Sequence, residues 1–245
     1  MDKALDSLPE LFYDLLAIFI PGFYCYYCFS LIYGQENLNN IVGVPLINET
    51  IAGLIMVYLL GFVVYFLSSY IIAKFFKVLF GDPKFTLLGS ELGKRQNFLN
   101  KHFLEEQSSI MVEHYRTNVE RGIRFVLKNS EYILKDNLDP AYELCRNYVM
   151  ERGTRSTTIR KEQAYGEMSR GIVLVSLISL IVLFIITGPL GIVVNNYWFV
   201  LGLFIFSFVT FSYRYGQARH INPIFIYSTF ISSVELNNEK EYEQK

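Results

Sequence analysis

The sequence predicts an all-α membrane protein with four transmembrane helices and a cytoplasmic helical domain inserted between spans 2 and 3. Two observations predict this fold. Seventeen of the 22 lysines and arginines lie between Lys74 and Arg170. The segments on either side of this block lack charged residues over 15–35, 50–73 and 171–213. Because a helix of about 20 apolar residues crosses a bilayer, the chain has room for several spans and one water-soluble insert.

The first two apolar stretches each contain one candidate span. One runs from about 11 to 33 and the other from about 51 to 73, so that residues 1–73 form a transmembrane hairpin. The ten residues before the first span carry three acids and one lysine, whereas a secretory signal peptide begins with a positive segment. We therefore expect the first span to stay in the mature protein. Pro21-Gly22 in its middle predicts a break or kink.

The third apolar stretch, 171–213, is long enough for two spans. Two turn signals interrupt it, one at Gly188-Pro189-Leu190-Gly191 and one at Asn195-Asn196. We therefore expect spans at about 171–190 and 196–213, which together form a second transmembrane hairpin.

The distribution of positive charge predicts the orientation. The connection 34–49 has two acids and no lysine or arginine, and the connection 189–195 has no charge. Cytoplasmic loops carry an excess of lysine and arginine. The connections 34–49 and 189–195 are therefore expected outside the membrane. The block 74–170 is expected in the cytoplasm, together with the tail 214–245, so that both chain termini are cytoplasmic.

The inserted domain, 74–170, has helical sequence signals. Apolar residues recur at helical spacing between 97 and 127, which predicts an amphipathic helix. Asp139-Pro140 has the pattern of an N-cap followed by proline in the first turn, and it predicts a second helix that ends near Glu151. A third helix is expected to begin near Ser156. No stop signal separates it from the third span, so one continuous helix is expected to enter the membrane.

The sequence contains no recognisable catalytic motif. Nucleophile elbows, zinc-protease motifs and phosphate loops are absent. Cys25 and Cys28 have the spacing of a zinc or redox pair, but they lie inside the first span without two further ligands, and packing is the simpler interpretation. We therefore expect no enzymatic activity, no metal and no cofactor.

Basic residues and tyrosines alternate near the end of the inserted domain. Arginine offers a planar donor fork to phosphate, and tyrosine offers a stacking face to a base. This predicts a site for a nucleotide or a short nucleic acid. The alternative, which the sequence leaves open, is that these positive charges set the topology and touch anionic headgroups. The candidate ligand-binding residues are Tyr142, Arg146, Tyr148, Arg152, Arg155, Arg160, Lys161 and Tyr165.

One carboxylate and two arginines are expected where the spans meet the cytoplasm. Asp14 lies in the first turn of the first span, where a charge is costlier than in water. Arg170 and Arg214 are expected at the same depth, so that Asp14 pairs with one of them. A gating charge is the alternative role for these residues.

Small and hydroxyl-bearing residues in the second and third spans predict close packing of helices. Lining a pore is the alternative for the same residues. Four spans leave little room for a transport path in one subunit, so any pore is expected to form between subunits of a homo-oligomer. These residues are Gly53, Gly61, Ser68, Ser69, Ser176, Ser179 and Thr187.

Three pieces of the chain resemble a family of small bacterial membrane proteins. They are Leu11–Gly22 (LFYDLLAIFIPG), Tyr58–Gly61 (YLLG) and Ala164–Arg170 (AYGEMSR), the last of which leads into an apolar span. Similar proteins are multi-span membrane effectors of anti-phage defence systems, such as the channel-forming partner of a nucleotidyltransferase in Hailong-type systems. The matching pieces cover less than a quarter of the chain.

The resemblance implies a homo-oligomeric ion channel or pore in the bacterial inner membrane. A nucleotide or oligonucleotide made by a partner nucleotidyltransferase would open it or hold it closed, and opening would depolarise the membrane and arrest growth. The cluster between Tyr142 and Arg170 is then the expected ligand site. The rival function is a membrane scaffold that recruits a cytosolic partner protein through the 74–170 domain.

Overall fold

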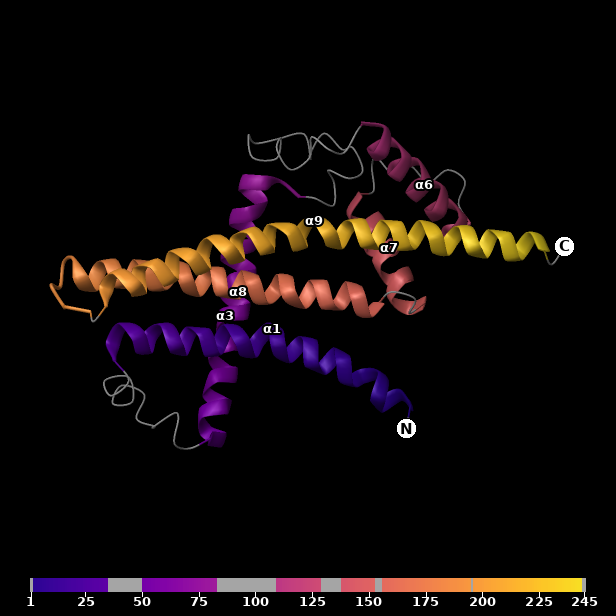
Figure 1. Cartoon of the computed structure of the whole chain (residues 1–245). Coiled ribbons are helices and arrows are strands. Elements are labelled where there is room, and N and C mark those ends of the chain that lie inside the picture. The colour runs from indigo at the N-terminus through magenta and orange to yellow at the C-terminus, as the bar shows by residue number, and fades with distance from the viewer. Residues whose placement is uncertain are drawn as a thin grey trace. The chain divides into compact units, whose positions relative to one another are not determined.

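The computed structural model describes residues 2–34, 50–82, 109–128, 138–152, 156–194 and 196–243. All regular structure in these ranges is helical, which confirms the predicted all-α class (Figure 1). The helices are α1 (Asp2–Tyr33), α3 (Thr50–Phe80), α6 (Ser109–Leu127), α7 (Leu138–Arg152), α8 (Ser156–Thr187) and α9 (Tyr197–Glu243).

Four of these helices are long and apolar enough to cross a membrane, as predicted. Their apolar segments are Leu15–Tyr33 in α1, Gly53–Phe80 in α3, Thr157–Thr187 in α8 and Tyr197–Glu235 in α9. Such lengths and compositions are those of a multi-pass membrane protein.

α7 and α8 begin where local sequence signals predict, whereas α9 continues beyond the predicted fourth span. α7 begins at Leu138, so that Asp139 lies in the first turn, where the helix dipole favours a negative charge. α8 begins at Ser156 and continues without a break to Thr187, as predicted. α9, by contrast, does not end near 213 but continues to Glu243, because apolar residues in its second half are buried in a core.

The helices belong to two compact units. Unit 1 comprises residues 1–75 and 163–218, and unit 2 comprises 76–162 and 219–245. The second half of α9 therefore shares a unit with the segment inserted between the second and third spans. α8 and α9 each contribute residues to both units.

Within unit 1, α1 and α3 cross where each helix carries a glycine (Figure 1). A methyl group added to Gly22 would overlap the Val57 carbonyl oxygen and lie 2.7 Å from the Gly61 nitrogen. One added to Gly61 would overlap the Ile18 carbonyl oxygen. Glycine allows membrane helices to approach this closely. α1 stays helical through Pro21 and Gly22, so the predicted break is absent.

α8 packs against the other three helices of unit 1. A methyl group on Gly171 would lie 2.8 Å from the Pro21 ring of α1 and 3.4 Å from Val64 of α3. One on Gly166 would lie 3.1 Å from the Ala218 side chain of α9. Small residues of α8 thus hold α1, α3 and α9 together.

The core of unit 2 is built by α6, α7, the start of α8 and the second half of α9. Its buried residues are Val119, Ile123, Ala141, Tyr142, Cys145, Val149, Ile159, Ile226, Tyr227, Phe230 and Val234. Phe230 is fully buried, and its ring fills the space above Gly122 of α6. This packing places α6 on α9.

Candidate functional site

The two α7 tyrosines expected to stack on a base pack inside unit 2. Tyr142 is 7% exposed, and its ring meets that of Tyr227 edge-on at 5.9 Å. The half-buried Tyr148 meets Phe230 in the same way at 5.3 Å. Burial raises the pKa of Tyr142 to about 12, so its hydroxyl stays protonated at neutral pH. Both rings therefore help to hold unit 2 together, and their role in ligand binding stays a prediction.

The α7 arginines of the predicted site are only partly described. Arg146 forms an ion pair with Glu143, one turn away on α7, at 3.3 Å. Exposed pairs of this kind contribute little to stability, so Arg146 remains available to a stronger anion. Arg152 is the last residue of α7, and its side chain lies outside the described part of the structure, as does Arg155.

The remaining members of the predicted site lie on α8 and are divided between the two units. Arg160 and Lys161 belong to unit 2, where Arg160 is half-buried and Lys161 is exposed. Tyr165 belongs to unit 1, where the Arg214 guanidinium carbon lies 5.8 Å from the centre of its ring. A cation over a tyrosine ring is attracted by the ring's electron-rich face.

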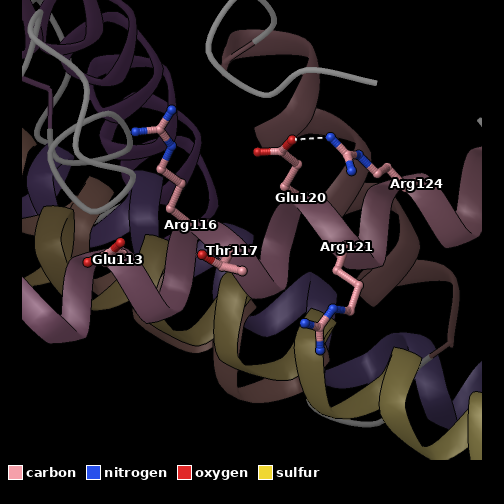
Figure 2. Close-up of a pocket in the computed structure, with 6 residues that line it drawn as sticks. All are labelled: Glu113, Arg116, Thr117, Glu120, Arg121 and Arg124. Atoms are coloured by element: carbon pink, nitrogen blue, oxygen red, sulfur yellow. Dashed lines mark hydrogen bonds and ion pairs between the residues drawn. The ribbon is translucent and has the colours of Figure 1, made fainter. Parts of the chain in front are cut away.

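The structure reveals a charged cavity on α6 that the sequence did not single out (Figure 2). Its volume is about 400 Å³. It is lined by Glu113, Arg116, Thr117, Glu120, Arg121 and Arg124. Arg116, Glu120 and Arg124 follow one another at intervals of four residues, a spacing that brings side chains together on one face of a helix. A search of the sequence for charged residues four positions apart would have found these three.

The charges of the α6 cavity are only partly neutralised. Arg124 donates to Glu120 at 2.6 Å and forms an ion pair with it. Within the described residues, neither Arg116 nor Arg121 forms an ion pair. Three arginines therefore stand against two glutamates, and the Thr117 hydroxyl adds a neutral polar group to the lining (Figure 2). Such a surface can bind a phosphate through an arginine fork.

Arg170 forms a second charged site, inside unit 1. Its Nε donates to the Ser68 hydroxyl at 3.3 Å, and its guanidinium carbon lies 5.3 Å from the centre of the Tyr65 ring. The buried Ser68 hydroxyl donates in turn to the Tyr65 carbonyl oxygen at 2.9 Å. A charge in an apolar span is costly unless it finds partners. These contacts partly offset that cost and link α8 to α3.

The predicted pair between Asp14 and one of the two arginines stays a prediction. Asp14 lies in α1, but its side chain is outside the described part of the structure. The described partners of Arg170 are on α3, and a described partner of Arg214 is Tyr165.

Ser68→Ala is expected to destabilise unit 1 by about 1–3 kcal/mol, because it removes a hydrogen-bond acceptor of a partly buried cation. The measurement is the thermal unfolding temperature in detergent. Ser69→Ala is the matched control: its hydroxyl also donates to a carbonyl one turn back, that of Phe66, at 2.6 Å. Equal losses for the two variants would show that the Arg170 contact contributes nothing.

Comparison with known proteins leaves the family of the chain open. No family model, no curated protein and no solved structure matches this chain. The features of the chain itself that bear on its function are the cavity on α6, the cations of unit 1 and the helices that contribute to both units.

Proposed function

We propose that this chain is a homo-oligomeric ion channel or pore of the bacterial inner membrane, gated by a nucleotide or oligonucleotide in anti-phage defence. The observation that carries the proposal is the continuity of α8. This helix contributes Ile159 to the core of unit 2 and Gly171 to the packing of unit 1. A ligand on unit 2 that prefers one position of α8 can therefore change the packing of the spans.

The α6 cavity supports an anionic ligand on unit 2. Arg116 and Arg121 supply donor forks there, and Thr117 supplies a hydroxyl. α6 is held to α9 through Gly122 and Phe230, and α9 also contributes to both units. The ligand shifts the balance between closed and open states by the ratio of its affinities for the two. A partner nucleotidyltransferase would make this ligand, as the resemblance implies.

The close packing of unit 1 supports a conduction path between subunits. Gly22, Gly61 and Gly171 each bring a helix directly against a neighbour. This packing places helix against helix along the middle of unit 1. Opening the channel then requires rearranged contacts between copies of the chain, and its output is membrane depolarisation and growth arrest.

The test is ion flux from liposomes that contain the purified protein, with short DNA, short RNA and cyclic nucleotides added in turn. The protein is expected to be an oligomer in detergent, and one ligand class is expected to change the flux. Arg116→Glu combined with Arg121→Glu should weaken the response at least tenfold, which corresponds to about 1.4 kcal/mol. Both changes lie on the charged face of α6, so unit 2 should stay folded.

Lys161→Glu is the matched control for the position of the site. It changes the charge of an exposed residue of unit 2 that lies outside the α6 cavity. Loss of the response in this variant alone would move the ligand to the Tyr142–Arg170 cluster. A protein that never leaks, and that leaves bacterial membrane potential and growth unchanged during phage infection, would contradict the channel.

The mixed charge of the α6 cavity favours one alternative, a scaffold that recruits a cytosolic protein. Glu113 and Glu120 beside the arginines would suit a partner surface that carries both signs. In that case the Arg116→Glu variant loses co-purification with the partner, and ion flux is absent in every protein tested.

A further inference from the structure

The turn between α8 and α9 has the side chains of a membrane interior. Leu190 is 62% exposed, Val193 is 89% exposed and Trp198, at the start of α9, is 80% exposed. No charged residue occurs between Arg170 and Arg214. Soluble surfaces rarely expose such a continuous apolar patch. The turn is therefore poorly suited to water.

The backbone of this turn is also suited to an apolar environment. Every N–H group from Gly188 to Ile192 is hydrogen-bonded within the hairpin, and Pro189 has no N–H to satisfy. Gly191 makes the tight turn possible with its positive φ of 62°. The donors and acceptors are Gly188 N to Phe184 O at 3.0 Å, Leu190 N to Ile185 O at 3.3 Å, Gly191 N to Gly188 O at 3.3 Å and Ile192 N to Ile186 O at 3.0 Å.

Satisfied donors matter because lipid offers no hydrogen bonds. An unpaired backbone N–H in hydrocarbon costs several kcal/mol, so loops exposed to lipid are ordinarily excluded from the membrane. At the start of α9 the Asn196 carbonyl oxygen accepts from the N–H groups of Phe199 at 2.9 Å and Val200 at 3.1 Å. The N–H groups of Val193, Val194, Tyr197 and Trp198 have no backbone partner within the described residues. The usual objection to a turn in hydrocarbon is thus removed for residues 188–192, and not for the residues that follow.

The distance from each of the two arginines to the turn is slightly shorter than the hydrocarbon core of a bilayer. α8 and α9 run antiparallel side by side (Figure 1). Gly166 of α8 faces Ala218 of α9, so Arg170 and Arg214, each one turn closer to the connection between the helices, lie at matching levels. At 1.5 Å per residue, each arm rises only about 25 Å from its arginine to the turn. The hydrocarbon core is about 30 Å thick. With both arginines at one interface, the turn only just reaches the other.

The turn also presents a concave surface that hydrocarbon can fill. A cavity of about 460 Å³ opens there between the end of α8, the turn and the start of α9. Its lining includes Phe184, Ile192, Val193 and Tyr197 and carries no charged residue. An acyl chain matches this lining, whereas water or a polar peptide would leave its apolar side chains in a polar environment.

We propose that the α8–α9 turn is a lipid-binding tip that stays in the leaflet opposite Arg170 and Arg214, with acyl chains of that leaflet against Val193 and Trp198. The charge distribution predicts that this connection lies outside the membrane, whereas a lipid-binding tip lies in the outer boundary of the bilayer. It requires unit 1 to lie in a membrane, but it does not depend on channel activity or on a nucleotide ligand.

Trp198 is the natural probe, because the chain has one tryptophan. The full-length protein is reconstituted into phosphatidylcholine vesicles and into vesicles whose acyl chains carry bromine. We expect blue-shifted emission, loss of the larger part of the emission in brominated vesicles, and no quenching by aqueous iodide present on both sides. Comparing lipids brominated at different carbons should place the ring near the headgroup end of the chains.

Two outcomes of the fluorescence experiment would overturn the proposal. Quenching by iodide without quenching by bromine would place the turn in water. Emission that responds to neither quencher would show that protein, such as a second copy of the chain, covers Trp198 instead of lipid.

A chemical test does not depend on fluorescence. Val193→Cys is expected to resist a charged maleimide applied to both sides of the vesicles and to react after unfolding in detergent. Lys161→Cys, at an exposed residue outside unit 1, is the positive control and should react at once. The three native cysteines are buried and define the background. Reaction of Val193→Cys as fast as the control would refute the lipid-bound tip.

Discussion

Gly61→Val is expected to prevent the normal packing of unit 1. The added side chain would enter the space held by the Ile18 carbonyl group, and backbone atoms cannot rotate away as a flexible side chain does. Overpacking usually costs about 1–3 kcal/mol when side chains can adjust, so a larger loss is expected here. The measurement is thermal unfolding in detergent together with the fraction of protein that elutes as a single species. Gly22→Val should have the same effect from the other side of the crossing.

Gly202→Val is the matched control for this prediction. Gly202 is also a helical glycine of unit 1, but a side chain added there meets open space. It should therefore unfold near the temperature of the unchanged protein. If Gly61→Val and Gly202→Val unfold alike, α1 and α3 are not in the close contact described above.

Phe230→Ala is expected to destabilise unit 2 by about 3–5 kcal/mol, the usual cost of removing a buried aromatic ring. The ring is fully buried, packs edge-on against Tyr148 and fills the space above Gly122. Its loss should loosen α6 and α7 together. Limited proteolysis should then cut between residues 109 and 152 faster than in the unchanged protein. Because α6 carries the charged cavity, the response to any nucleotide should weaken as well.

Phe206→Ala separates this packing effect from the general loss of a phenylalanine. Phe206 lies on the same helix but is 69% exposed, and its ring is outside the core of unit 2. Its removal should leave proteolysis of α6 and α7 unchanged. Equal cleavage rates for the two variants would contradict the placement of Phe230 at the centre of unit 2.

Features that depend on neighbouring residues along the chain can be predicted from the sequence alone. An uncharged apolar stretch of bilayer length identifies a candidate span wherever it occurs, so all four long helices were predicted. The absence of a stop signal after Ser156 predicted the continuous α8. Asp139-Pro140 placed the start of α7 to within a residue or two. None of these features depends on which other part of the chain lies nearby.

The partners that these helices contact are known only from the folded chain. The sequence showed that Gly61 is small, but not that Ile18 of α1 lies against it. The sequence showed that Tyr142 has an apolar ring and a polar hydroxyl. Only its packing against Tyr227 in the folded chain showed that the ring lies in a core. The second half of α9 stays helical because unit 2 covers its apolar side chains. A residue's burial depends on segments far away in the chain, and a local pattern contains no information about them.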